Sequence, residues 1–161
     1  MSHQIVAIDI TQIDSSPTAN LGQLYINKNG NHYRYMQADG SVTAYEPYSY
    51  TAGTWQIDAP MDLTVTPTTA GTCPLCVWDG SATAITDNYY AWVFVGPGTF
   101  TAKIDGSAAT AGAIVYGHAT AGLTSTTASA LLLNGVTVPV TMAAATGTLY
   151  AATGLWAVDL A

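Results

Sequence analysis

Five Asn-Gly or Asp-Gly pairs divide this chain of 161 residues into short segments, and they constrain its fold more than any other feature. The pairs are Asn29-Gly30, Asn134-Gly135, Asp39-Gly40, Asp79-Gly80 and Asp105-Gly106. Pairs of this kind favour tight turns, because glycine adopts the positive φ that such turns need. The runs between them are rich in Val, Ile, Tyr, Thr and Trp, which are typical of strands. We therefore predict an all-β fold, a single compact β-sandwich or β-barrel-like domain.

Alternation and composition place the expected strands along the chain. They are Gln4–Ile13, Gln23–Asn27, His32–Ala38, Thr54–Asp58, Leu63–Thr66, Asn88–Val95, Thr99–Asp105, Ala113–Tyr116, Val136–Val140 and Leu155–Leu160. The second and third flank Asn29-Gly30 as a hairpin, and the strand from Thr99 should turn Phe100, Ala102 and Ile104 inward. Residues 124–133 are the one segment that could hold a short helix.

The first 20 residues differ from the rest, so we divide the chain into residues 1–20 and a β-domain of residues 21–161. Residues 1–20 are an extended apolar stretch that ends in a linker-like sequence of small and polar residues, Asp14–Asn20. They are either the first strand of the core or an extended N-terminal arm that docks on a neighbour, and the sequence leaves both open.

The segment Asn88–Val95 is apolar on both sides of an extended chain. Tyr90, Trp92 and Phe94 fall on one side, and Tyr89, Ala91, Val93 and Val95 on the other. The second side is covered either by another part of the same chain or by a second copy. Because the chain carries so few charges, we favour an assembly, with Tyr90, Trp92 and Phe94 as the subunit interface.

Charge excludes several classes of partner. Only 8% of the residues are charged, against about a quarter in a typical soluble domain. The net charge is −7, and the basic residues are Lys28, Arg34 and Lys103. Binding to nucleic acid needs clustered Lys and Arg, and an anionic membrane surface needs the same, so we expect neither partner. No apolar stretch is long enough to span a bilayer, and residues 1–20 do not resemble a secretory signal, so synthesis in the cytoplasm is expected.

Few residues suggest chemistry. Cys73 and Cys76 have the CxxC spacing of redox sites, but the residues that follow predict a strand and a turn rather than a helix. A zinc site would need further ligands, and Asp58 and Asp62 match no calcium-loop pattern. No nucleophile elbow, dinucleotide fingerprint or phosphate loop is found in the sequence. We therefore predict no enzymatic activity, no catalytic residues, no metal and no cofactor.

Aromatic residues are concentrated in two parts of the chain, around Tyr33–Tyr50 and Tyr89–Phe94. Stacking on sugars, as in a carbohydrate-binding domain with Tyr48 or Tyr50 in its site, is one interpretation. Core packing together with protein contact is the other, and we prefer it because Tyr and Trp are common in interfaces.

Most of the range from residue 21 to residue 160 resembles small accessory proteins of tailed-bacteriophage heads. The resemblance rests on Leu21-Gly22 followed by a Gly30–Tyr35 hairpin, on the YYAWVFVG strand Tyr89–Gly96, and on the DG…AAG turn Asp105–Gly112. An Ala/Thr-rich stretch and a final apolar strand follow. Ala91 stands where such proteins commonly have glycine, and the cysteine pair is unusual.

The resemblance implies a capsid decoration, or cement, protein on the outer surface of the virion. Its partners would be the major capsid protein and its own copies, as a homotrimer. An N-terminal arm would lie on the capsid protein through Ile5, Val6, Ile8, Ile10 and Ile13, by strand addition or apolar packing. Alternatives are a component of the phage tail or fibre, or a carbohydrate-binding β-domain.

Overall fold

The computed structural model describes residues 8–61, 72–105, 108–127, 131–143 and 145–159. These residues form thirteen strands, and no helix is found among them, so the predicted all-β fold is confirmed. The strands are β1 (Ile13–Asp14), β2 (Leu24–Ile26), β3 (His32–Ala38), β4 (Pro47–Thr51), β5 (Gln56–Pro60), β6 (Thr72–Val77), β7 (Tyr90–Phe94), β8 (Gly98–Ile104), β9 (Ile114–Gly117), β10 (Thr124–Ser125), β11 (Leu131–Thr137), β12 (Ala145–Ala151) and β13 (Trp156–Asp159).

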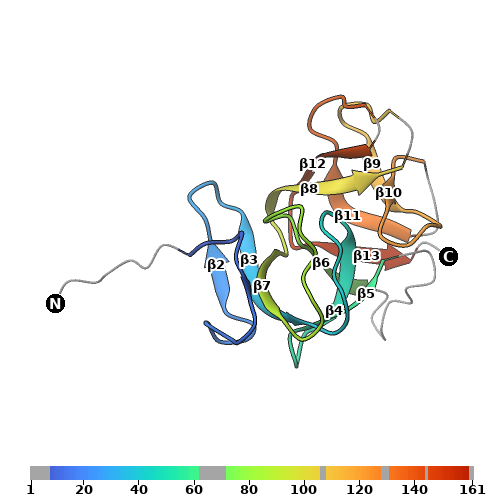
Figure 1. Ribbon diagram of the computed structural model, residues 1–161. Helices are drawn as coiled ribbons and strands as arrows, with labels where there is room; N and C mark the ends of the chain where they lie inside the picture. The colour runs from blue at the N-terminus through green and yellow to red at the C-terminus, as the bar shows by residue number, and fades with distance from the viewer. Residues whose placement is uncertain (1–7, 62–71, 106–107, 128–130, 144, 160–161) are drawn as a thin grey trace.

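The strands close into two barrel-like sheets (Figure 1). The first, which we call the N-terminal barrel, runs β3-β5-β4-β6-β7 and closes where Val77 of β6 pairs with Phe94 of β7. The second, the C-terminal barrel, runs β8-β12-β11-β9-β10 and closes where β10 pairs with β8. Strand β13 joins the two, because it pairs with β11 on one side and with β6 on the other.

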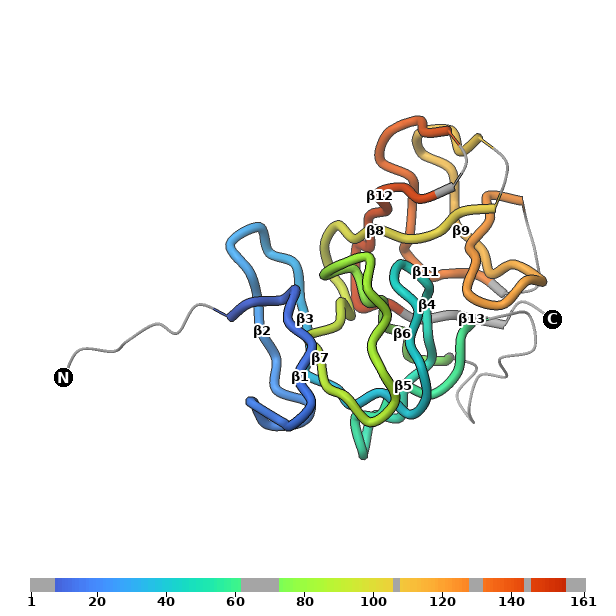
Figure 2. Tube along the Cα trace, viewed as in Figure 1, coloured from blue at the N-terminus to red at the C-terminus, as the bar shows by residue number. Residues whose placement is uncertain are grey.

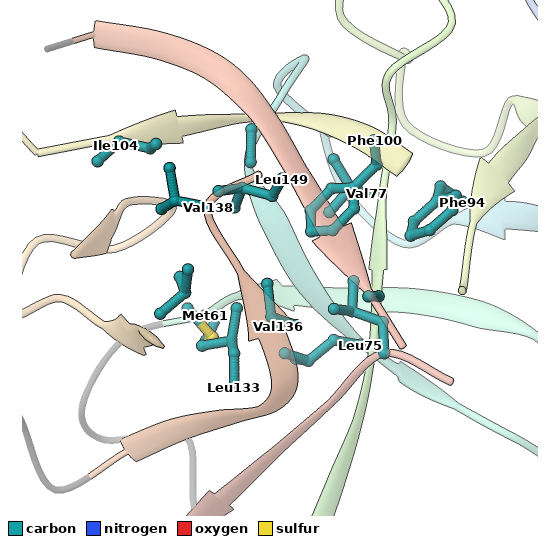
Figure 3. Packing of buried hydrophobic residues seen from close by; sticks show 14 of the residues in the cluster. Met61, Leu75, Val77, Phe94, Phe100, Ile104, Leu133, Val136, Val138 and Leu149 are labelled. Carbon is teal, nitrogen blue, oxygen red and sulfur yellow. The ribbon is translucent and has the colours of Figure 1, made fainter. Parts of the chain in front are cut away.

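Strand β6 separates the two cores. Residues of alternate parity point to opposite sides of a strand, so Cys73, Leu75 and Val77 pack in one cluster and Cys76 packs in the other. The first cluster fills the C-terminal barrel and the space between the barrels, where Leu75, Val77, Phe94 and Phe100 lie together (Figure 3). The second fills the N-terminal barrel. Apolar burial on both faces therefore binds the two barrels into one folded unit.

The chain itself covers both faces of β7. Ala91, Val93 and Val95 point into the N-terminal barrel. On the other face, the ring centre of Trp92 lies 5.2 Å from that of Tyr35, and Phe94 stacks on Phe100 at 4.7 Å. Trp92 and Phe94 are buried in the single chain.

Residues 8–20 complete this covering. Ile8, Ile10 and Ala19 pack against the cluster that contains Trp92, and β1 pairs with β7 at Ala91 and Tyr90. Figure 2 shows this dark-blue segment lying beside β3 and β7. The sequence left open whether the N-terminal residues are a first strand or a docking arm. Ile13 and Asp14 form a first strand of the domain.

A buried hydrogen-bond network holds the same segment in place. The Tyr35 hydroxyl donates to Asp14 Oδ2 at 2.6 Å, and the Thr18 hydroxyl donates to the same oxygen at 2.7 Å. The Thr18 backbone N–H in turn donates to the Tyr35 hydroxyl. Asp14 and Thr18 thus tie the linker-like sequence Asp14–Asn20 to Tyr35 of β3.

The hairpin around Asn29-Gly30 is confirmed. The Asn27 side-chain oxygen accepts hydrogen bonds from the N–H groups of Asn29 and Asn31, and Gly30 has φ of 81°. The inward orientation of Phe100, Ala102 and Ile104 on β8 is confirmed as well, since all three are buried.

Two expectations were wrong. The segment 124–133, which could have held a short helix, is strand at both ends, with β10 at Thr124–Ser125 and β11 beginning at Leu131. Asn134-Gly135 lies inside β11 rather than at a hairpin turn. There, β11 changes its partner from β13 to β12, and the positive φ of Gly135 serves this irregularity. The expected strand Leu63–Thr66 lies outside the described residues.

Candidate protein-binding site

The outer edge of β2 is the candidate site, because no strand among the described residues pairs with it. On its inner edge β2 pairs with β3. The Tyr35 N–H donates to the Gln23 carbonyl, and the Asn27 N–H donates to the Asn31 carbonyl. Because hydrogen-bonded and outward-facing residues alternate in an antiparallel pair, the backbone groups of Leu24 and Ile26 point to the free edge. Free edges of this kind are templates for strand addition.

This edge also exposes apolar side chains. Leu24 is 44% exposed and Ile26 is 51% exposed, and Leu21 lies just before them. The opposite face of the hairpin is partly buried at Tyr25, whose ring packs edge-on against Trp92 with 5.9 Å between the ring centres. One face of β2 therefore belongs to the core and the other presents leucine and isoleucine to the surroundings.

A pocket of about 210 Å³ adjoins the exposed face of β2. It lies at one end of the N-terminal barrel, and residues from β2, β3, β4 and β6 contribute to it. Its lining consists of Leu24, His32, Arg34, Tyr50, Pro74, Val95, Gly96, Gly154 and Leu155. The pocket therefore combines apolar side chains with the polar groups of Arg34, His32 and Tyr50.

Two contacts fix the guanidinium of Arg34 at this pocket. Its Nη1 donates to the Gly22 carbonyl at 2.5 Å, and its central carbon lies 4.6 Å from the ring centre of Trp55. Trp55 stacks in turn on Tyr50 at 6.0 Å. A side chain at position 22 would collide with the Trp55 ring, so Gly22 permits this close approach. The cation is thus pre-positioned by stacking and by one hydrogen bond.

Charge at the hairpin is opposite to that of the rest of the molecule. No Asp or Glu occurs between Ser15 and Ala38, whereas Lys28, Arg34 and His32 do. Lys103, the third basic residue, is paired with Glu46 at 2.6 Å. In the part of the chain that the structure describes, no carboxylate forms an ion pair with Arg34. The hairpin is therefore a positively charged element on a protein of net charge −7.

The protonation state of Tyr50 makes its hydroxyl a hydrogen-bond donor in this pocket. Burial raises the pKa of Tyr50, so its hydroxyl remains a neutral donor at physiological pH.

The predicted subunit interface is corrected for two of its three residues. Trp92 and Phe94 are covered by their own chain and have too little exposed surface to form a contact between copies. Tyr90 is half-buried and stacks on Tyr35. The same chain therefore covers both faces of β7. Residues 8–20 and the C-terminal barrel lie over the face that carries Trp92 and Phe94.

The predicted capsid-contact arm is corrected in part. Ile13 pairs with Ala91 and packs, partly buried, against the core of the N-terminal barrel. Ile8 and Ile10 are partly buried against the same domain. Ile5 and Val6 lie outside the described residues, and their role as capsid contacts stays a prediction.

The two cysteines do not form a redox pair. Both are free and buried, and their spacing of three along β6 places Cys73 in one core and Cys76 in the other. Burial raises the pKa of both thiols, which keeps them protonated and unreactive. They are packing residues.

One side-chain cluster contains serine, histidine and aspartate. The Ser125 hydroxyl donates to Asp105 Oδ2 at 2.9 Å, and His118 Nε2 lies 3.9 Å from the same oxygen. A catalytic triad needs the histidine between the serine and the acid, whereas here the carboxylate lies between the other two. Ser125 is therefore not arranged as the nucleophile of such a triad.

The acidic residues do not gather into a metal site in the described part of the chain, where no group of three or more His, Cys, Asp or Glu could hold an ion. Asp62, one of the two residues considered for calcium, lies outside that part.

Tyr48, considered for sugar stacking, is buried, whereas Tyr50 is half-buried at the pocket. No helix in the described residues is long and apolar enough to cross a membrane.

Sequence reasoning did not identify Leu24, Ile26 or Arg34 as site residues. The sequence signal that could have found them is the run without Asp or Glu from Ser15 to Ala38, which contains two of the three basic residues.

Comparison with known proteins adds no identification, because neither a protein-family model nor a curated protein matches this sequence.

Proposed function

We propose that this chain is a non-enzymatic decoration protein that binds the outer capsid surface of a tailed bacteriophage and stabilises the shell. The observation that supports it most is the free β2 edge, with unpaired backbone groups, exposed Leu24 and Ile26, and a pre-positioned Arg34 beside a pocket. Such an edge is suited to binding another protein rather than to transforming a small substrate. The sparse charge elsewhere and the resemblance of residues 21–160 to phage head proteins agree with this function.

Many copies on one shell would act together. Each contact can be weak, because a capsid offers many equivalent sites and the copies that hold neighbouring subunits oppose their separation jointly. We propose a homotrimer as the bound unit. Native mass spectrometry of the purified protein measures this, and a monomer that stays monomeric on the shell would contradict it.

Stoichiometry in purified particles is the first experiment. We expect this chain at a ratio near one to the major capsid protein, measured by gel densitometry. A ratio of a few per cent would instead support a tail or fibre component. Absence from particles would overturn the virion function and would make a glycan array the next measurement, with Tyr50 as the residue to mutate.

A further inference from the structure

The geometry points to a specific kind of partner for the β2 edge. We propose that it accepts an extended strand of the capsid protein, and that this strand carries an Asp or Glu whose carboxylate enters the pocket beside Arg34 and His32. The inference rests on the proposed function and specifies the chemistry of its partner.

Main-chain groups of β2 are free to bond an added strand. The outward N–H and C=O groups of Leu24 and Ile26 lie two residues apart, which is the spacing at which such a strand forms its hydrogen bonds. In the described residues they have no strand partner. Their exposed side chains would pack against apolar residues of the added strand.

Register then brings a side chain to the pocket. Residues that face one another across paired strands project to the same side of the sheet. Leu24 pairs with Arg34, and Ile26 pairs with His32, so all four belong to one face. The pocket is lined by Leu24, His32 and Arg34. A residue opposite Leu24 on the added strand therefore projects toward this pocket.

Charge selects the type of that side chain. Arg34 is held by stacking on Trp55 and by the Gly22 carbonyl, neither of which neutralises it. A guanidinium binds a carboxylate with charge-assisted hydrogen bonds. No acid between Ser15 and Ala38 opposes this attraction.

The same charges argue against a second copy as the occupant. Two hairpins that paired edge to edge would bring two positively charged elements together. The chain's own first seven residues, MSHQIVA, contain no carboxylate, so a neighbour's N-terminal segment would not supply one. The observations therefore favour a foreign acidic strand.

Binding of variants to shells that lack this protein tests the inference. We expect Arg34→Gln to weaken binding about tenfold or more. The matched control Lys28→Gln removes the same charge from the exposed turn and should change the affinity less than about twofold. On binding, the amides of Leu24 and Ile26 should become protected from hydrogen exchange.

A proline variant keeps the test valid if Arg34→Gln folds poorly. Ile26→Pro removes an outward N–H and leaves the hydrogen bonds to β3 intact, so the melting temperature should be kept while shell binding is lost. Wild-type binding with unprotected Leu24 and Ile26 amides would overturn the strand addition. Equal affinity of wild type and Arg34→Gln would overturn the acidic partner and leave the proposed function standing. Failure of the wild type to bind any shell would overturn both.

Discussion

Asp79 shows how one residue makes stability depend on pH. Burial raises its pKa from 3.8 to about 6, and the N–H groups of Thr101 and of Asp79 itself offset this only in part. Its Oδ1 is buried and has no hydrogen-bond partner. Folding thus favours the protonated acid, so ionisation destabilises the protein above about pH 6, and this penalty disappears as the pH falls toward 3.8.

We therefore expect Asp79→Asn to be more stable than wild type at pH 8, by on the order of 2 kcal/mol. The gain should vanish near the ordinary pKa of 3.8. Chemical denaturation across this pH range measures it. Asp39→Asn, at an exposed aspartate of another Asp-Gly pair, is the control and should change little. A variant less stable than wild type at pH 8 would contradict the prediction.

Tyr35 is the second residue whose contribution can be measured. Its hydroxyl bonds Asp14 and receives the Thr18 N–H, in a network at the core. Tyr35→Phe leaves both partners short of a hydrogen bond and should cost about 1–3 kcal/mol of unfolding free energy. Tyr150→Phe removes a hydroxyl from a ring that is 43% exposed and should cost less than about 0.5 kcal/mol. Similar losses in the two variants would count against the network.

The cysteines give a third prediction at this scale. Because both thiols are buried and protonated, alkylation of the native protein should be slow and should become fast only in denaturant. Mass spectrometry after timed alkylation measures the rate. Rapid modification of either cysteine in the folded protein would show that β6 is more accessible than described.

At the scale of the element, β2 separates binding from folding. Ile26 and Ile114 are each 51% exposed, on the hairpin and on β9. Ile26→Asp places a negative charge at the proposed acceptor edge and should weaken shell binding at least tenfold, whereas Ile114→Asp should leave it nearly unchanged. Neither should alter the melting temperature by more than a few degrees, because both side chains face out. Equal effects of the two on binding would remove β2 from the interface.

Elements with a clear alternation could be predicted from the sequence, and the others could not. The hairpin, β7 and β8 follow from their aromatic and β-branched residues and from Asn29-Gly30. Strand β6 was missed because Pro74 and the CxxC spacing hide it, and β12 because Ala, Thr and Gly dominate it. Asn134-Gly135 was predicted as a hairpin turn but lies inside β11, because glycine can supply a positive φ to an irregular strand as well as to a turn.

The candidate site was harder to predict, for a tertiary reason. Leu24, Tyr25 and Ile26 all suit a strand, but which of them is exposed depends on where Trp92 lies. The apolar face of β7 was correctly recognised as needing a cover. The sequence did not reveal that residues 8–20 supply part of it, since that contact joins segments about 80 residues apart.

For the whole molecule, the length of an N-terminal deletion should decide its effect. Removal of residues 1–14 takes away β1 and the Asp14 carboxylate, so the domain should lose roughly 3 kcal/mol or more of stability. Removal of residues 1–7 takes away Ile5 and Val6 and spares β1. If these two are capsid contacts, the shorter deletion should weaken shell binding while thermal unfolding is unchanged. Full shell binding after the shorter deletion would remove these two residues from the interface.

Strand β6 has one face in each core, and this limits how such a protein can be divided. A gene fragment that ends before Thr72 lacks a wall of the N-terminal barrel, and one that begins after Val77 lacks the strand that β13 pairs with. Neither half is therefore a module that recombination could transfer intact to another protein. The two barrels should be inherited together, and a protease that cuts between β6 and β7 should release fragments that no longer fold alone.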